Sequence, residues 1–348
     1  MAERIPLVLK FNDWPQADKI AWDALFAPGD IFDDLGPCAH WSEGSRKKRE
    51  QGYGQWLSFV RRTDPKAFNE TPAIRVTEVR ASAFVEECEA RLRPASTNGL
   101  ISDLFVVVRA MSPDADWNWL ATASKRFHGK ANRKNLPPPH PVGAGEILSR
   151  CLDHMQKVER SDHLAPLTRS IRYRQALMIA FLICRPVRRR ALLGMTKNQH
   201  LKVTPEGFHL HFAASDMKDR RARDFSMPKM LIAPMRHYLD VHRPVLLQGK
   251  ITDSLWINQY GDSITADGLS RELPKVTKRL LGVGLGPHAF RHIAATTIAE
   301  TDPEHVNIIR DILGHSTLDM AEKHYNRATG ISACNEFQAI VEGICKSR

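Results

Sequence analysis

The sequence predicts a mainly α-helical protein with one small β-hairpin or sheet, in which the strands are confined to an α+β second half. Three observations predict this class. Apolar residues recur at helical spacing in most segments, two strand-like segments flank a single polar turn, and a basic, proline-rich stretch divides the chain near its middle. A chain of 348 residues is long for one core, so we expect two domains.

The composition is that of a folded, soluble protein. Hydrophobic residues make up 43% and charged residues 26%, which excludes a wholly disordered chain. The longest apolar run, Ala176 to Cys184, is too short to cross a bilayer, and the N-terminus does not resemble a signal peptide. Six scattered cysteines without a C-x-x-C pair suggest neither a zinc ribbon nor a disulfide framework. We therefore expect a cytoplasmic protein.

The charge balance is basic, because 50 Lys and Arg residues stand against 39 Asp and Glu residues, for a net charge of +11. This excess favours a polyanionic partner, either nucleic acid or an acidic membrane surface.

The first half is predicted to be a small helical bundle. We expect residues 1–39 to form an N-terminal extension with one short helix near 16–26, followed by a helical domain over 40–125. Tyr53, Trp56, Leu57 and Val60 have the i, i+3, i+4, i+7 spacing of one helix face. Helices are expected within this domain over 42–60, 76–92 and 97–111.

A linker is predicted over 126–143. The stretch SKRFHGKANRKNLPPPHP, residues 124–141, holds five Lys or Arg residues and no acid, and then four prolines in five positions. We expect it to run extended rather than as a regular helix. It is either a solvated linker or a strap along a phosphate backbone.

The second domain is predicted to span 144–330. A buried helix over 171–183 precedes the basic segment RPVRRR, and FHLHFAAS (208–215) and RDFSMP (223–228) read as a β-hairpin. A further helix is expected in 234–245. We expect another helix to begin at Asp302-Pro303 and to end at Gly314, and the next to begin at Ser316 to Asp319.

The segment GPHAFRH, residues 286–292, places His288, Arg291 and His292 on one helix face. Either a metal binds the histidines, with His315 as a third ligand, or a phosphate-like anion binds all three groups. The metal is disfavoured because Ala289 stands where a zincin helix has its catalytic glutamate, and because Arg291 would lie beside the cation. A third possibility is that His288 is simply a satisfied, buried histidine.

Further motifs extend this pattern in a fixed order. Arg188 follows the buried helix, Lys218 lies in the hairpin turn, and H-x-x-R is followed by LGH at 313–315 and then by Tyr325. Over residues 165–330 the order and spacing resemble the tyrosine recombinase family, also called phage integrases. The resemblance implies a helical core-binding domain at 40–125 and a catalytic domain at 144–330.

The resemblance also implies a role for each matched residue. Tyr325 would attack the scissile phosphate to give a 3′-phosphotyrosyl enzyme and a free 5′-hydroxyl, and Lys218 would protonate that leaving oxygen. Arg188 and Arg291 would hold the non-bridging oxygens, where the guanidinium fork matches a phosphate. The implied catalytic set is Arg188, Lys218, His288, Arg291, His315 and Tyr325, with His292 in support.

Two departures from the family pattern leave alternatives open. Ala191 stands where members often have an acidic residue, so Arg185, Arg189 or Arg190 could replace Arg188 as the phosphate ligand, and Arg220, Arg221 and Arg223 compete with Lys218. Tyr325 lies ten residues after His315, where nine is commoner, and His324 occupies the usual place.

Prepositioned cations can stabilise a phosphoryl-transfer transition state without a metal, so we expect no cofactor. The expected partner is double-stranded DNA. The resemblance implies that a homo-oligomer binds it, as a tetramer on two DNA sites, and that an accessory directionality factor is a possible further partner. A telomere resolvase or topoisomerase-like enzyme, a non-cleaving DNA-binding relative and a zinc hydrolase are the alternatives. The candidate DNA-binding cations are Arg46, Lys47, Lys48, Arg49, Lys125, Arg126, Lys130, Arg133 and Lys134.

The tail, 331–348, is predicted to form a short helix with one apolar stripe, Phe337, Ile340, Val341 and Ile344. The stripe packs either on its own domain or, as the family resemblance implies, on a neighbouring protomer.

Overall fold

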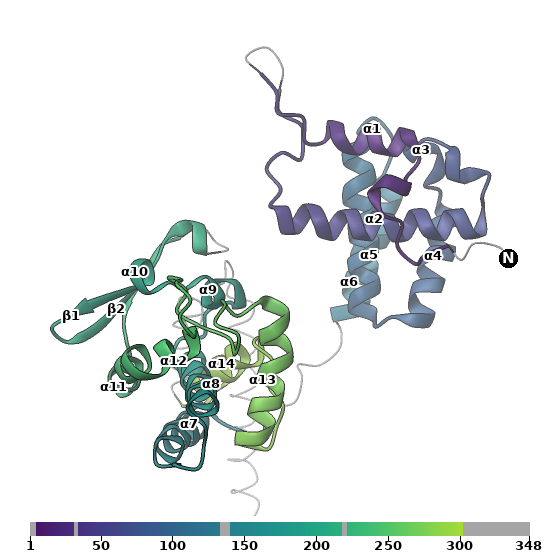
Figure 1. Cartoon of the computed structure of the whole chain (residues 1–348). Helices are drawn as coiled ribbons and strands as arrows, with labels where there is room; N and C mark the ends of the chain where they lie inside the picture. The colour runs from purple at the N-terminus through teal and green to yellow at the C-terminus, as the bar shows by residue number, and fades with distance from the viewer. Residues whose placement is uncertain (1–4, 31–33, 133–139, 218–220, 302–348) are drawn as a thin grey trace, which may run out of the picture. The chain divides into compact units, whose positions relative to one another are not determined.

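The computed structural model describes residues 5–30, 34–132, 140–217 and 221–301. The described chain is mainly helical and carries a three-stranded antiparallel sheet, which confirms the predicted fold class. It divides into two compact units, residues 1–136 and 137–348 (Figure 1). None of the helices in these ranges is long and apolar enough to span a bilayer.

The first unit is helical, and two of its helices begin at side-chain caps. Ser42 Oγ accepts a hydrogen bond from Ser45 N, and Thr77 Oγ1 accepts one from Arg80 N, as expected of hydroxyl residues at the N-cap. The three helices predicted over 42–60, 76–92 and 97–111 are confirmed. The bounds are α1 Gln16–Ala24, α2 Glu43–Thr63, α3 Pro72–Arg75, α4 Glu78–Arg91, α5 Pro94–Met111 and α6 Asn118–Asn132.

The core of this unit forms around the predicted apolar face of α2. Tyr53, Trp56, Leu57 and Val60 are all fully buried. Trp56 packs edge-to-face on Phe84 of α4, with ring centroids 5.4 Å apart.

The segment predicted as an N-terminal extension belongs to the same core, which corrects the boundary at residue 40. Leu9, Trp14 and Trp22 are buried against α2. The backbone of Leu9 bonds to Gly54, where an added Cβ would lie only 2.4 Å from the Leu9 carbonyl oxygen. The segment before α1 is short and irregular, so its burial produces no periodic pattern in the sequence.

A buried ion pair fixes α1 to α3. Arg75 Nη1 lies 2.6 Å from Asp18 Oδ1, and both side chains are fully buried. The Tyr53 hydroxyl donates to the same carboxylate oxygen at 2.6 Å.

The expectation that residues 124–141 avoid helical structure was wrong for the first half of that stretch. Helix α6 continues to Asn132. Lys, Arg and Ala are good helix formers, and the first helix-breaking proline comes only at Pro137. The division between the units falls after residue 136.

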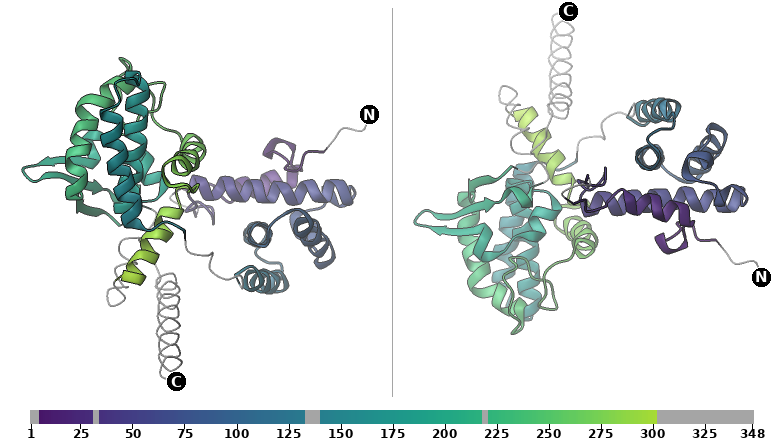
Figure 2. Two further views of the ribbon diagram at one scale, coloured as in Figure 1. Left: turned by 90° about the horizontal axis from the view of Figure 1, so that it is seen from below. Right: turned by 90° about the horizontal axis from the view of Figure 1, so that it is seen from above.

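The second unit is built around α8, whose residues Ala176 to Ile183 are buried on all sides, as predicted for this apolar run. Helix α7 lies beside α8, as Figure 2 shows. The bounds are α7 Ala144–Glu159, α8 Pro166–Cys184, α9 Arg189–Gly194, α10 Lys197–His200, β1 Leu201–Thr204, β2 Gly207–Phe212, β3 Arg223–Ser226, α11 Lys229–His237, the π-helical turn η4 Tyr238–His242, α12 Arg243–Leu247, α13 Ala266–Leu281 and α14 Ala289–Thr301.

The sheet has the strand order β1-β2-β3. The predicted hairpin is confirmed as β2 and β3, which pair antiparallel with Phe212 opposite Arg223. Strand β1 was not predicted, because it has only four residues and Val203, its apolar centre, is 77% exposed. The buried side chains of β2 alternate with its histidines, as in a sheet with one covered face.

Candidate active site

The position of Arg188 follows from the end of α8. Arg185 precedes Pro186 and has a non-helical backbone, with φ −135° and ψ 84°, because a proline disfavours the helical region for the residue before it. The helix therefore ends at Cys184. Four residues after Cys184, Arg188 is the N-cap of α9.

Arg291 lies in the first turn of α14 and is only 5% exposed. One of its guanidinium nitrogens donates to the carbonyl of Pro186, so α14 is tied directly to the segment that carries Arg188. Burial and then the charges of Arg188 and Arg223 lower the pKa of Arg291 to about 10. The group thus keeps its charge at neutral pH under repulsion from two other guanidinium groups.

His288 immediately precedes α14 and is exposed, while His292 is half-buried one turn later. Their rings meet edge-to-face with centroids 4.8 Å apart. Partial desolvation, followed by the charges of Arg291 and Arg188, lowers the pKa of His288. A neutral imidazole at pH 7 can accept a proton, which suits a general base.

These groups concentrate positive charge at one place in the second unit. Arg188, Arg223 and Arg291 come from three different elements, and the charges of the first two act on Arg291. Arg223 also lines a groove of about 510 Å³, between residues 184–187 and 222–225. Such repulsion is relieved when an anion binds, and guanidinium groups match the oxygens of a phosphate.

The neighbouring arginines have other contacts. Arg185 donates to the Cys184 and Ser226 carbonyl oxygens, both at 3.0 Å. Arg189 donates to Ser270 Oγ on α13 at 2.9 Å, and Arg190 is exposed. The charge of Arg188, by comparison, acts on both Arg291 and His288, which favours Arg188 as the partner of Arg291.

Three predicted catalytic residues, Lys218, His315 and Tyr325, lie outside the described residues, as do the helices expected after residue 302 and the predicted tail helix. Arg223 was considered only as a competitor of Lys218. Its position opposite buried Phe212 at the start of β3 brings it to Arg291, and the sequence pattern of the hairpin gave no hint of that.

The basic start of α2 is exposed, but several of its cations have intramolecular contacts. Lys48 Nζ lies 2.6 Å from the carboxylate of Asp103, whose side chain is only 8% exposed, so Lys48 neutralises a buried acid. The guanidinium of Arg46 lies 4.0 Å from the ring centre of Phe26, and that of Arg49 lies 3.9 Å from Trp41. Lys47 is exposed.

Of the candidate cations near the predicted linker, Lys125 and Arg126 are exposed on α6. Lys130 belongs to the same helix, whereas Arg133 and Lys134 lie outside the described residues.

The second unit matches a known family. The model of the phage integrase family matches residues 152–330, just over half of the 348-residue chain. The chain belongs to the phage integrase family.

The chain is similar to curated tyrosine recombinases. The chain is 28% identical over 181 residues to tyrosine recombinase XerD of Chlorobaculum tepidum. The matched region covers 49% of this chain and 56% of that protein. It is 24% identical over 157 residues to XerD of Staphylococcus epidermidis, covering 45% of this chain and 51% of the relative. The chain thus spans about half the length of the curated relatives it matches.

Solved structures show the same fold. A pre-cleavage complex of the XerH site-specific recombinase with its difH substrate superposes with a TM-score of 0.56 at 15% identity, over 83% of this chain and 78% of that one. The post-cleavage complex of XerH with a palindromic difH substrate gives a TM-score of 0.55 at 17% identity, over 80% of this chain and 75% of that one.

Proposed function

We propose that the protein is a site-specific DNA recombinase that cuts and rejoins strands through a 3′-phosphotyrosyl intermediate, without a metal in the reaction. The convergence of Arg188, Arg223 and Arg291 beside His288 carries this proposal. A phosphodiester is the anion that best fits such a site in a member of the phage integrase family.

In the proposed first step, the Tyr325 hydroxyl oxygen attacks the scissile phosphorus and forms the phosphotyrosyl bond. The bond to the 5′-oxygen breaks, and Lys218 gives that oxygen a proton. The tyrosine proton passes to neutral His288, whose lowered pKa suits it to this task. In the second step, the 5′-hydroxyl of another strand attacks the phosphotyrosine and releases Tyr325.

The arginines supply the charge that this transfer requires. Phosphoryl transfer is catalysed mainly by positioning and by stabilising charge on the non-bridging oxygens. Arg188 and Arg291 would bind these oxygens, with Arg223 as a third positive charge and His315 as a hydrogen-bond donor. Burial of Arg291 strengthens its interaction with a bound phosphate, since less water competes with it.

The proposed substrate is double-stranded DNA. The XerH structures to which this fold is similar contain the difH substrate. We propose that the basic start of α2 and the cations of α6 also contact DNA, and that tetramers assemble on two sites on nucleoid DNA in the cytoplasm.

The test is covalent capture on a nicked suicide substrate that carries candidate recombination-site DNA. Wild-type protein should form a protein–DNA adduct that survives denaturation. Tyr325→Phe should form none and keep nearly unchanged DNA affinity, because the hydroxyl supplies chemistry and little binding. Tyr260→Phe is the matched control, since Tyr260 is a 66% exposed tyrosine that lines a different pocket from Arg223. An adduct that persists in Tyr325→Phe would assign the nucleophile elsewhere.

Products formed on an intact supercoiled plasmid with two candidate sites separate the alternatives. A recombinase exchanges strands between the two sites, whereas a topoisomerase-like enzyme only relaxes supercoils and a telomere resolvase leaves hairpin ends. A non-cleaving relative would bind DNA without any adduct.

A further inference from the structure

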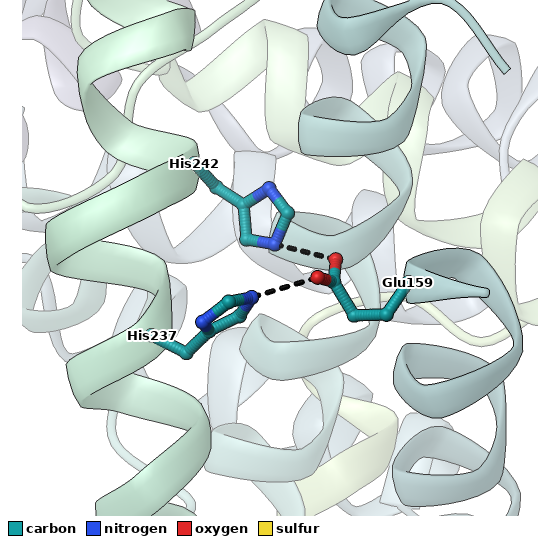
Figure 3. Close-up of side chains that lie close together, drawn as sticks. All are labelled: Glu159, His237 and His242. Atoms are coloured by element: carbon teal, nitrogen blue, oxygen red, sulfur yellow. Dashed lines mark hydrogen bonds and ion pairs between the residues drawn. The ribbon is translucent and has the colours of Figure 1, made fainter. Parts of the chain in front are cut away.

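We propose that Glu159, His237 and His242 form a binding site for a transition-metal cation, with zinc as the best-fitting ion. Glu159 is the last residue of α7, and the two histidines lie at the ends of α11 and η4. Both imidazoles point their Nε2 atoms at the same carboxylate (Figure 3). His237 Nε2 lies 2.8 Å from Glu159 Oε2, and His242 Nε2 lies 2.9 Å from Oε1.

The backbone is shaped so that these histidines meet. They are five residues apart, and on a regular α-helix such residues project about 140° apart. The wider π-helical turn of η4 brings them to one face, with ring centroids 5.0 Å apart. Pro244 favours this turn, because it lacks an N–H and its ring would clash with the carbonyl of Asp240 in a regular helix. Turns of this kind occur frequently at functional sites.

The separations suit a small cation. One donor atom from each of the three residues lies within 4.8 Å of the other two. Ligand atoms around a tetrahedral zinc with bonds of about 2.0–2.1 Å are roughly 3.3 Å apart. Binding would therefore lengthen the two histidine–carboxylate separations slightly and shorten any separation near the 4.8 Å limit. Two imidazoles and a carboxylate favour zinc over magnesium or calcium, which prefer oxygen ligands alone.

Surrounding side chains hold the most buried ligand in place. His242 Nδ1 lies 3.1 Å from Ser170 Oγ, and the Tyr173 ring stacks on the imidazole with centroids 4.1 Å apart. When Nδ1 carries the proton and donates to Ser170, Nε2 presents a lone pair to the ion.

The site is open to solvent on one side, so an ion can enter it and a water molecule can occupy a remaining coordination position. The His242 side chain is 1% exposed, but those of His237 and Glu159 are 39% and 33% exposed. The cluster shares no residue with the arginine site. A bound zinc would therefore join the end of α7 to α11 and η4 as a structural link and would take no part in phosphoryl transfer.

The competing explanation is a metal-free network, in which each imidazole donates a hydrogen bond to Glu159. The experiment uses the untagged full chain, treated with EDTA, freed of chelator and titrated with ZnCl₂ against a chromogenic zinc indicator. We expect one zinc per chain, no competition by Mg²⁺, and a rise in Tm of roughly 5–10 °C at a hundredfold excess over Kd.

Variants at the site identify the ligands. His237→Gln and Glu159→Gln should each weaken zinc binding by more than tenfold and remove most of the zinc-dependent rise in Tm. Both positions are partly exposed, and the apo Tm of each variant reports whether it folds. His211→Gln is the matched control, since His211 also pairs with a carboxylate, Asp224 Oδ1 at 2.7 Å on the sheet. It should bind zinc as the wild type does.

Three results would overturn the proposal. The folded wild type could fail to bind zinc, His237→Gln could retain wild-type zinc affinity, or zinc binding could be lost in His288→Gln instead. The last result would place the ion among the arginines and histidines of the candidate active site.

Discussion

Replacing Arg291 by lysine should make strand cleavage pH-dependent in a way that the wild type is not. The surroundings of Arg291 lower its pKa from the ordinary 12.5 to about 10, mainly through burial. The ordinary pKa of a lysine side chain is about 10.4, and lowering it by the same amount places the midpoint of the lysine titration at about pH 8. The substituted lysine would therefore lose its charge as pH rises through this value, whereas Arg291 stays largely charged up to pH 9.5.

Two effects should combine in Arg291→Lys. Loss of the guanidinium fork costs about 2–4 kcal/mol in the transition state, or roughly 30- to 1000-fold in rate, at every pH. Deprotonation adds a further decrease of about 20- to 30-fold between pH 6.5 and 9.5, because only about 3% of the lysine is charged at the upper limit.

The measurement is the second-order rate of adduct formation on a nicked substrate, at DNA concentrations below Kd. Under these conditions the profile reports the free enzyme, before a bound phosphate can raise the lysine pKa. The ratio of variant to wild-type rates removes the contribution of tyrosine ionisation, which both proteins share. Arg190→Lys, at an exposed neighbour, should give a constant ratio. A constant ratio for Arg291→Lys would refute the burial argument, and a ratio near one at every pH would refute the assigned role.

The other predictions concern metal and stability. Cleavage at 25 °C should survive EDTA, because cations of the chain replace metal in the reaction, even if EDTA lowers Tm; activity lost in EDTA and restored by zinc or magnesium in still-folded protein would contradict the proposed chemistry. Arg75→Met should destabilise the first unit by about 3–5 kcal/mol in urea unfolding, since it leaves Asp18 charged and buried. The double variant Asp18→Leu/Arg75→Met should recover part of that loss, and purely additive effects would argue against the pair.

Helices and the hairpin could be predicted from the sequence because their signals are local. The spacing of Tyr53, Trp56, Leu57 and Val60 identifies the buried face of α2 without knowledge of its partners. The segment around Leu9 could not be placed in this way, because its burial depends on a close approach to Gly54, forty-five residues along the chain.

For the candidate site, the sequence predicted which residues belong to it and their order along the chain, but not how they are arranged in space. Arg188 and Arg291 are about a hundred residues apart, and the bond from Arg291 to the Pro186 carbonyl results from packing of α14 against α8. The cluster of Glu159, His237 and His242 gave no sequence signal, since it depends on a π-helical turn that breaks the helical spacing.

Arg46 and Arg49 can contribute to DNA binding by α2 in two ways. One is their positive charge, and the other is the side-chain order that their aromatic contacts impose before DNA binds. Immobilising a long side chain at an interface costs about 0.5–1.5 kcal/mol. The guanidinium groups on Phe26 and Trp41 have already lost part of this freedom within the folded unit. Lysine at either position would keep the charge, and hence the number of counterions released, but would lose the planar group that stacks on the ring. The first unit can therefore gain affinity for a phosphate backbone from rigidity as well as from charge, and only the charge contribution weakens with salt.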